Sequence, residues 1–271
     1  QGGINRGERQ ATSMSTHGVH ANCIEDMWLA AIEIARRAGG DRGCLGLFGP
    51  DTPPLAAKPN RLIVLETAGW AILDDASKSA FEALLENLQQ AGVTLLRRKD
   101  NALVEKLEQA IVEAPAICNA ITRWENHWAQ RNLVDQKGEF VSDRLKAGLA
   151  QAEAMSPDDY RAALLAREAA QRCHDAVGLL ADAAITLSCP GPAPLWPGDI
   201  QGQPLAARPT GDAIFNTPSS MLFAPCVTMP LLAVGGMPLG VQVTGQQHQD
   251  AQMTAIARWM LDTMEPIIMG S

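Results

Sequence analysis

Apolar residues recur along the chain in two spacings, one typical of helices and one of buried strands. Helical spacing predicts helices over residues 24–37, from about Lys78 to Gln90, and from Asp250 toward the C-terminus. Short apolar runs, partly β-branched, predict strands at 61–65, 93–96, 183–187, 226–232 and 239–243. Because the first two strands flank the 78–90 helix, they are expected to pair in parallel through a crossover. The pattern therefore predicts an α/β fold.

Between about residues 102 and 182 the pattern is almost entirely helical. The run Ser156-Pro157-Asp158-Asp159 predicts a helix start, because serine caps, proline fits the first turn, and acids face the positive helix end. That helix is expected to reach about Leu180, and a short helix is expected near 218–223. Proline and glycine are frequent in 189–212, which predicts a long loop of a kind that is often functional. We interpret the chain as one α/β domain over 1–271 with a helical subregion at 102–182.

Composition narrows the class of protein. The chain has 271 residues, 46% of them hydrophobic, enough for a substantial core. The formal charge is −8 and no basic run occurs, so direct binding of nucleic acid is not predicted. No stretch of about 18 apolar residues is present, so no membrane span is predicted. Six widely spaced cysteines indicate reduced thiols and a cytoplasmic protein. The start at Gln1, without methionine, indicates a fragment or a processed chain.

Two short motifs contain residue types that can bind a metal or catalyse a reaction. His17, His20 and Cys23 have a spacing that could supply three zinc ligands, but the sequence offers no evident fourth ligand. We therefore predict no metal site.

The second motif is Cys173-His174-Asp175, which has the residue types of a nucleophile, a base and an orienting acid. The three are consecutive on a predicted helix, where neighbours do not face each other. We expect instead a buried Cys173 and an exposed His174. No nucleophile elbow, P-loop or dinucleotide-binding glycine motif occurs, and no cofactor is predicted.

Two parts of the chain carry a resemblance to a known family. Three C-terminal blocks occur in fixed order: Pro190–Pro194 (PGPAP), Thr210–Pro218 (TGDAIFNTP) and Met237–Gly245 (MPLGVQVTG). Their order and gaps resemble the distal part of the amidase-signature family. Residues 13–26 are similar to the segment that follows the family's signature, with matches at Ser13, Gly18, Ala21 and Asp26. The resemblance implies a mixed β-sheet flanked by helices, amidase-signature-like but incomplete.

Three positions depart from the family pattern. Ser15 stands where the family usually has aspartate, and Asn22 stands in place of its arginine. Phe223 stands where glycine is more usual. We expect these departures to reflect altered specificity or a divergent subgroup.

The resemblance also implies an activity. Family members hydrolyse amides with a serine nucleophile, a second serine and a lysine, all of which are expected upstream of Gln1. No residue of this chain inherits a catalytic role, and the isolated chain is expected to be inactive. Asp212, Asn216 and His17 are the predicted substrate-binding residues. For Asp212 the alternative is that it caps the following helix.

Three functions stay open at this point. The first is a serine-dependent amidase acting on a linear carbon–nitrogen bond of a small-molecule amide. The second is the amidase-like subunit of a glutamine-dependent tRNA amidotransferase. The third is a non-catalytic binding module, which is disfavoured because a truncated sheet leaves unpaired edges. Amidases of this type are often dimers, so the resemblance also implies a homodimer.

Overall fold

The computed structural model describes residues 4, 11–41, 44–195, 198 and 211–270. Its helices are α1 (Ile24–Ala38), α2 (Asp75–Gln90), α3 (Ala102–Ile111), α4 (Ala114–Lys137), α5 (Asp143–Glu153), α6 (Pro157–Val177), α7 (Thr217–Leu222) and α8 (Asp250–Thr263). Short 3-10 helices are η1 (Ala68–Ile72) and η2 (Gly138–Phe140). The strands are β1 (Arg61–Val64), β2 (Thr94–Leu96), β3 (Ala183–Leu187), β4 (Cys226–Val234), β5 (Met237–Thr244) and β6 (Ile267–Met269).

The strands form one mixed sheet in the order β2-β1-β3-β5-β4-β6. β1 pairs in parallel with β2 and β3, as the crossover pattern predicts for the first pair. β5 is antiparallel to β3 and β4. The β4–β5 connection contains Gly235 and Gly236 at φ 58° and 77°, and two adjacent positive φ angles are what a tight hairpin turn requires. The predicted α/β class with a mixed sheet is confirmed.

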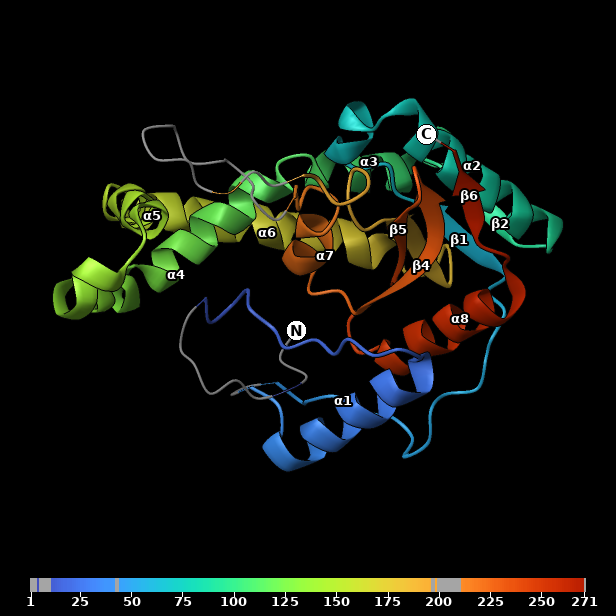
Figure 1. The fold of residues 1–271 in the computed structure, drawn as a ribbon, viewed down its shortest axis with the longest axis horizontal. Helices are drawn as coiled ribbons and strands as arrows, with labels where there is room; N and C mark the ends of the chain where they lie inside the picture. Colours follow the sequence, from blue (N-terminus) through green and yellow to red (C-terminus); the bar gives the residue numbers. More distant parts are fainter. Residues whose placement is uncertain (1–3, 5–10, 42–43, 196–197, 199–210, 271) are drawn as a thin grey trace.

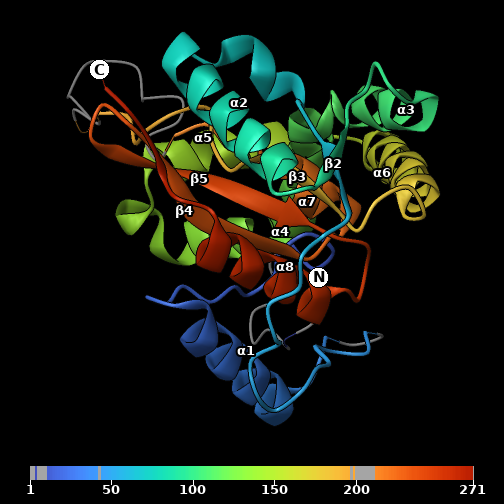
Figure 2. The same cartoon turned by 90° about the vertical axis from the view of Figure 1, so that its right-hand side faces the viewer.

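Helices cover both faces of this sheet (Figures 1 and 2). Successive side chains of β1 point to opposite faces. Leu62 and Val64 point into the core under α2 and α8, whereas Ile63 points toward α3, α4, α6 and α7. This alternation is the two-residue period of a strand buried on both faces. α1 lies outside α8, on its far side from the sheet (Figure 1).

The region predicted to be helical contains α3 to α6, and α4 and α5 extend away from the sheet (Figure 1). Ser156 begins α6 with a capping box, in which Asp159 N–H donates to Ser156 Oγ and Ser156 N–H donates to Asp159 Oδ2. α6 ends at Val177, slightly before the predicted Leu180, because Gly178 follows as its C-cap. In the part of the chain that the structure describes, no helix is long and apolar enough to cross a membrane.

Candidate functional site

The carboxyl ends of β1 and β3 lie at the same edge of the sheet, and Phe215 is buried there. A Cβ on Gly69 would lie 2.4 Å from Phe215 Cε2, so the ring fits only because residue 69 is glycine. The Gln242 side chain, also buried, donates from Nε2 to the carbonyls of Phe215 (2.9 Å) and Leu187 (3.1 Å). Cys226 Sγ donates to Gln242 Oε1 at 2.7 Å. Phe215 and Gln242, both in the family-like blocks, therefore fix the segment that leads into α7.

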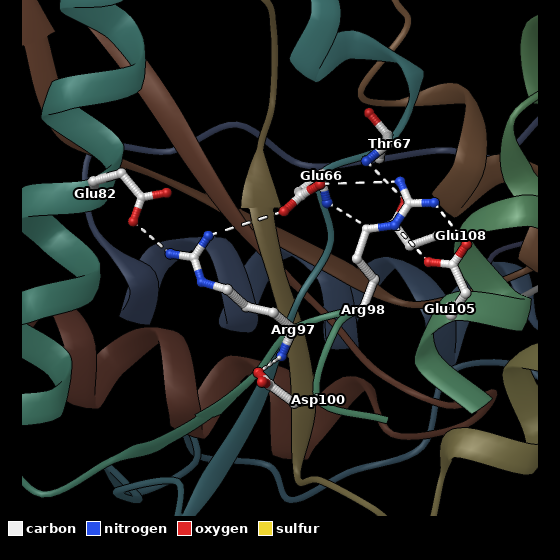
Figure 3. Close-up of polar contacts among 8 residues, drawn as sticks. All are labelled: Glu66, Thr67, Glu82, Arg97, Arg98, Asp100, Glu105 and Glu108. Carbon is white, nitrogen blue, oxygen red and sulfur yellow. Dashed lines mark hydrogen bonds and ion pairs between the residues drawn. The ribbon is translucent and has the colours of Figure 1, made fainter. Parts of the chain in front are cut away.

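A buried carboxylate supports the same edge from α3. Glu108 accepts hydrogen bonds from the backbone N–H groups of Glu66 (2.6 Å) and Thr67 (3.0 Å), as Figure 3 shows. Thr67 has φ 56°, and its Oγ1 accepts from Gly69 N–H at 3.0 Å. Burial raises the pKa of Glu108 to about 7, against the lowering effect of the two backbone donors. Glu108 thus holds the turn on which Phe215 packs, and we name Gly69, Glu108, Phe215 and Gln242 the carboxyl-edge cluster.

Ion pairs surround Glu108 at the surface. The Arg98 guanidinium forms a bidentate ion pair with Glu105, from Nε to Oε2 at 2.6 Å and from Nη2 to Oε1 at 2.8 Å (Figure 3). Arg98 Nη1 also lies 4.0 Å from Glu66 Oε2. Arg97 pairs with Glu82 from the other side. Partly exposed pairs of this kind contribute about 0–1 kcal/mol each, so the buried Glu108 matters more to the turn than its neighbours.

The predicted substrate-binding residues Asp212 and Asn216 lie just before α7. Asp212 Oδ1 accepts from Ile214 N–H at 3.0 Å, which closes a turn ahead of the helix. The alternative that Asp212 caps α7 is wrong, because Asn216 is the N-cap position and makes no side-chain cap bond. Asn216 is exposed, and Asp212 is half-buried.

His17, the third predicted residue, lines a different place. A cavity of about 500 Å³ lies between the segment Thr16–Ile24, the inner face of α1, Phe223 and the first half of β4. We name it the β4 cavity. Asp212 and Asn216 are not among the described residues that line it. The six residues of α7, about 9 Å of helix, separate Asn216 from Phe223. The three predicted residues are therefore divided between two sites.

The three residues that depart from the family pattern lie at the end of α7, at the β4 cavity and in a turn near the N-terminal end of the described chain. Phe223 ends α7 with φ 56°, a left-handed conformation that favours glycine, which explains why glycine is more usual there. Asn22 lines the β4 cavity, and Ser15 N–H donates to the Ala11 carbonyl at 2.9 Å in a turn.

His17, His20 and Cys23 all line the β4 cavity, as their spacing along one segment allows. Cys23 Sγ accepts from Asp26 N–H at 3.5 Å and so caps α1. Among the described residues no group of three or more His, Cys, Asp or Glu side chains is arranged to hold a metal ion.

The expectation for the Cys173 motif is wrong. His174 is only 4% exposed, whereas Cys173 is half-buried. The reason is the register of α6, which buries Ala170, His174 and Val177 at helical spacing against its neighbours. Burial lowers the pKa of His174, so the imidazole is neutral near pH 7.

Comparisons with known proteins agree with this fold. Residues 1–254 match the family model described as Amidase. The 2-amino-5-chloromuconic acid deaminase of Comamonas testosteroni is 27% identical over 253 residues, which are 91% of this chain and 51% of that protein. The chain thus spans about half the length of the curated relative it matches.

Solved structures share the fold. A crystal structure of an amidase matches with a TM-score of 0.66 and 21% identity, over 79% of this chain and 48% of that chain. A component of the Glutamyl-tRNA(Gln) amidotransferase from Thermotoga maritima matches with a TM-score of 0.61 and 17% identity, over 90% and 52%. The family match covers most of the sequence, so the chain belongs to the Amidase (amidase signature) family.

Proposed function

We propose that this chain is the C-terminal half of a serine-dependent amidase that hydrolyses a linear carbon–nitrogen bond of a small-molecule amide. The catalytic lysine and two serines would then lie in polypeptide that precedes Gln1, and this chain alone is inactive. The family membership and the coverage of about half of the relative's length support this division. The six thiols are all free, which fits a reducing cytoplasm.

The observation that carries the proposal is the open edge of β4. β6 pairs with β4 only from Leu232 to Val234, and no described strand pairs with Cys226–Leu231 on that side. The β4 cavity adjoins this free edge. An unpaired edge with a cavity beside it suits an additional strand, because the strand would satisfy the free backbone groups and fill the space.

Exposed apolar side chains near α1 support the same arrangement. They are Leu29, Ile34, Leu45 and Phe48, which are 44%, 45%, 71% and 65% exposed. Large apolar side chains that are exposed in this part of the chain are available for contact with other polypeptide. The upstream polypeptide would cover them.

In the proposed enzyme the serine attacks the amide carbonyl, the amine leaves, and water hydrolyses the acyl-enzyme. This chain would contribute the wall of the pocket. Asp212 and Asn216 would contact polar groups of the substrate at the carboxyl-edge cluster, and His17 would face the upstream segment from the β4 cavity. Neither role requires a metal or a cofactor.

The test is to express the complete reading frame and the chain Gln1–Ser271 side by side. Ammonia release from benzamide and hydrolysis of p-nitroacetanilide report activity, and a fluorophosphonate probe reports a reactive serine whatever the substrate. We expect labelling and turnover in the complete polypeptide and neither in the chain alone. A complete polypeptide that carries a lysine and two serines, yet neither reacts with the probe nor hydrolyses any amide, would sink the proposal.

A component of a tRNA amidotransferase is the second candidate function, and the match to the Glutamyl-tRNA(Gln) amidotransferase structure favours it. In that case the complete polypeptide would co-purify with partner proteins and release ammonia from glutamine only in their presence. The homodimer stays a proposal that size-exclusion chromatography with light scattering tests.

A further inference from the structure

Contacts from two helices of the helical subregion, α4 and α6, converge on the short turn at residues 11–15. Ser13 N–H donates to Glu125 Oε2 of α4 at 2.8 Å, and Ser13 Oγ donates to Glu125 Oε1. Ala11 N–H donates to Asn126 Oδ1, the next residue of α4. Arg167 Nη1 of α6 donates to the Ser13 carbonyl at 3.2 Å and to Ser13 Oγ at 2.9 Å. Residues more than 110 positions away thus determine the conformation of this turn.

The turn itself is strained and partly buried, so it needs such support. Ala11 has φ 43°, a left-handed value that costs a non-glycine residue about 1–2 kcal/mol. Its side chain is only 7% exposed, and the Ala11 carbonyl accepts from the N–H groups of Met14 and Ser15 at 2.9 Å each. A strained backbone persists only where the surroundings determine it, and here those surroundings are α4 and α6.

The Glu125 carboxylate is itself held in place. Tyr160 O–H donates to Glu125 Oε1 at 3.0 Å, and its ring stacks on Trp124 with centroids 5.5 Å apart. Burial and the bond to Glu125 raise the pKa of Tyr160 to about 12. Fixed partners of this kind reduce the side-chain entropy that Glu125 loses when it binds Ser13.

Arg167 also reaches the end of α7. Its guanidinium carbon lies 4.7 Å from the centroid of the Phe223 ring, a cation–π contact. Phe223 lines the β4 cavity, and the turn at 11–15 leads directly into the segment Thr16–Ile24 that lines it from the other side. One arginine therefore connects both walls of the cavity.

We propose that Glu125 and Arg167 are positioning residues that fix the turn at residues 11–15 and the end of α7 relative to each other across the β4 cavity. The catalytic consequence rests on the proposed function, in which the catalytic serines lie shortly before this turn. An error of about 1 Å in the position of a catalytic group can cost about a hundredfold in rate. The helical subregion would then place the catalytic segment rather than contact the substrate.

Hydrogen–deuterium exchange on the complete polypeptide tests the positioning directly. Glu125→Ala and Ser13→Ala should each raise the exchange rate of peptides within residues 11–16 by about tenfold or more, since a bond to a charged group is lost. Arg167→Met should raise exchange within both 11–16 and 217–224, because Arg167 contacts both. Arg167→Lys keeps the charge and should restore part of the protection.

Glu153→Gln is the matched control. Glu153 forms an exposed pair with Arg131 of α4, so its loss should leave both segments unchanged. The proposal is overturned if exchange in 11–16 is unaffected by Glu125→Ala and Ser13→Ala, or if it rises equally in α2 and α8. Ser13→Ala removes only one hydroxyl, which keeps the test decisive should Glu125→Ala fail to fold.

Kinetics separate positioning from general stability. With benzamide as the probe, Glu125→Gln should lower kcat about tenfold or more and leave KM within about twofold, because the segment carries reacting groups rather than substrate contacts. An equal change in KM would argue against positioning. If the unmodified polypeptide neither reacts with the fluorophosphonate probe nor hydrolyses any amide, the proposed function fails, and the exchange data still decide whether Glu125 and Arg167 hold the turn.

Discussion

The carboxyl-edge cluster and the β4 cavity lie at opposite ends of α7, and they differ in how completely their groups are partnered. At the cluster, Gln242 satisfies two buried carbonyls and Glu108 satisfies two backbone N–H groups. At the cavity, the edge of the first half of β4 has no described strand partner, and a space of about 500 Å³ lies beside it. Exposed apolar residues occur on and after α1. The two regions thus differ in how many of their backbone groups have partners within the described chain. The groups of the cluster are partnered within this chain, whereas the first half of the β4 edge beside the cavity has no described strand partner.

The largest expected effect comes from substituting Gln242 in the carboxyl-edge cluster. Gln242→Leu keeps the volume but leaves the carbonyls of Leu187 and Phe215 without their side-chain donor, which should cost about 3 kcal/mol or more. Urea unfolding followed by circular dichroism measures it. Gln252→Leu is the control, because Gln252 donates to a carbonyl from an exposed position and should matter little.

The next effect depends on pH and concerns Glu108. Its pKa is about 7 in the folded protein against an ordinary 4.5, so between these values the folded state binds a proton that the unfolded state releases. The unfolding free energy should therefore fall as pH rises through this window, by up to about 3 kcal/mol. Glu108→Gln should remove this slope.

Urea midpoints at several pH values from 5 to 8 check the Glu108 prediction. Glu105→Gln is a suitable control, since Glu105 lies on the same helix and its pKa is lowered by the hydrogen bond from Arg98. If the wild-type protein and Glu108→Gln show the same slope between pH 5 and 7, burial of the Glu108 carboxylate has no energetic role.

A smaller effect follows from the contact between Gly69 and Phe215. Gly69→Ala places a methyl group 2.4 Å from the ring, and such overpacking costs about 1–3 kcal/mol. Gly148→Ala is the matched control, because nothing lies within 4 Å of a Cβ at that position of α5. It should stabilise the chain by about 0.5–1 kcal/mol, and thermal unfolding distinguishes the two.

The smallest effect is expected at Phe223, which lines the β4 cavity. Phe223→Gly relieves the left-handed backbone but loses the contact with Arg167, so the net change should stay below about 1 kcal/mol. Phe223→Ala loses the ring and keeps the strain, and thermal unfolding should show it to be less stable than Phe223→Gly by about 1 kcal/mol. Equal stability of the two variants would mean that the positive φ angle carries no cost.

The sequence predicts most elements of this fold, because helical spacing and apolar runs report directly which face of an element is buried. β6 is missed, since its three residues follow the predicted C-terminal helix closely and form no separate apolar run of strand length. The burial of His174 is also missed, because it depends on which neighbours α6 meets and not on the residue types. Glu108 could have been found, as an acid among Val104, Leu107 and Ile111 on the apolar face of α3.

The site is less predictable than the fold. The family-like blocks identify Phe215 and Gln242 as members of a motif, but their mutual hydrogen bond joins positions that only the folded sheet brings together. Asp212, Asn216 and His17 are expected in one pocket because they lie in family-like segments. The length of α7 separates them, and that separation is a tertiary property. Their role as substrate contacts stays a prediction.

The order of strands in the sheet also has a consequence for synthesis on the ribosome. Ile63 of β1 pairs with Ala184 of β3, which is made about 120 residues later. At about 5–20 residues per second, β1 leaves the ribosome roughly 6–24 s before its neighbour exists. Helices α3 to α6 emerge in that interval and can form locally, since the backbone hydrogen bonds of a helix join residues four positions apart. β1 therefore waits for β3, and during these seconds the nascent chain carries an apolar strand edge without its later partner.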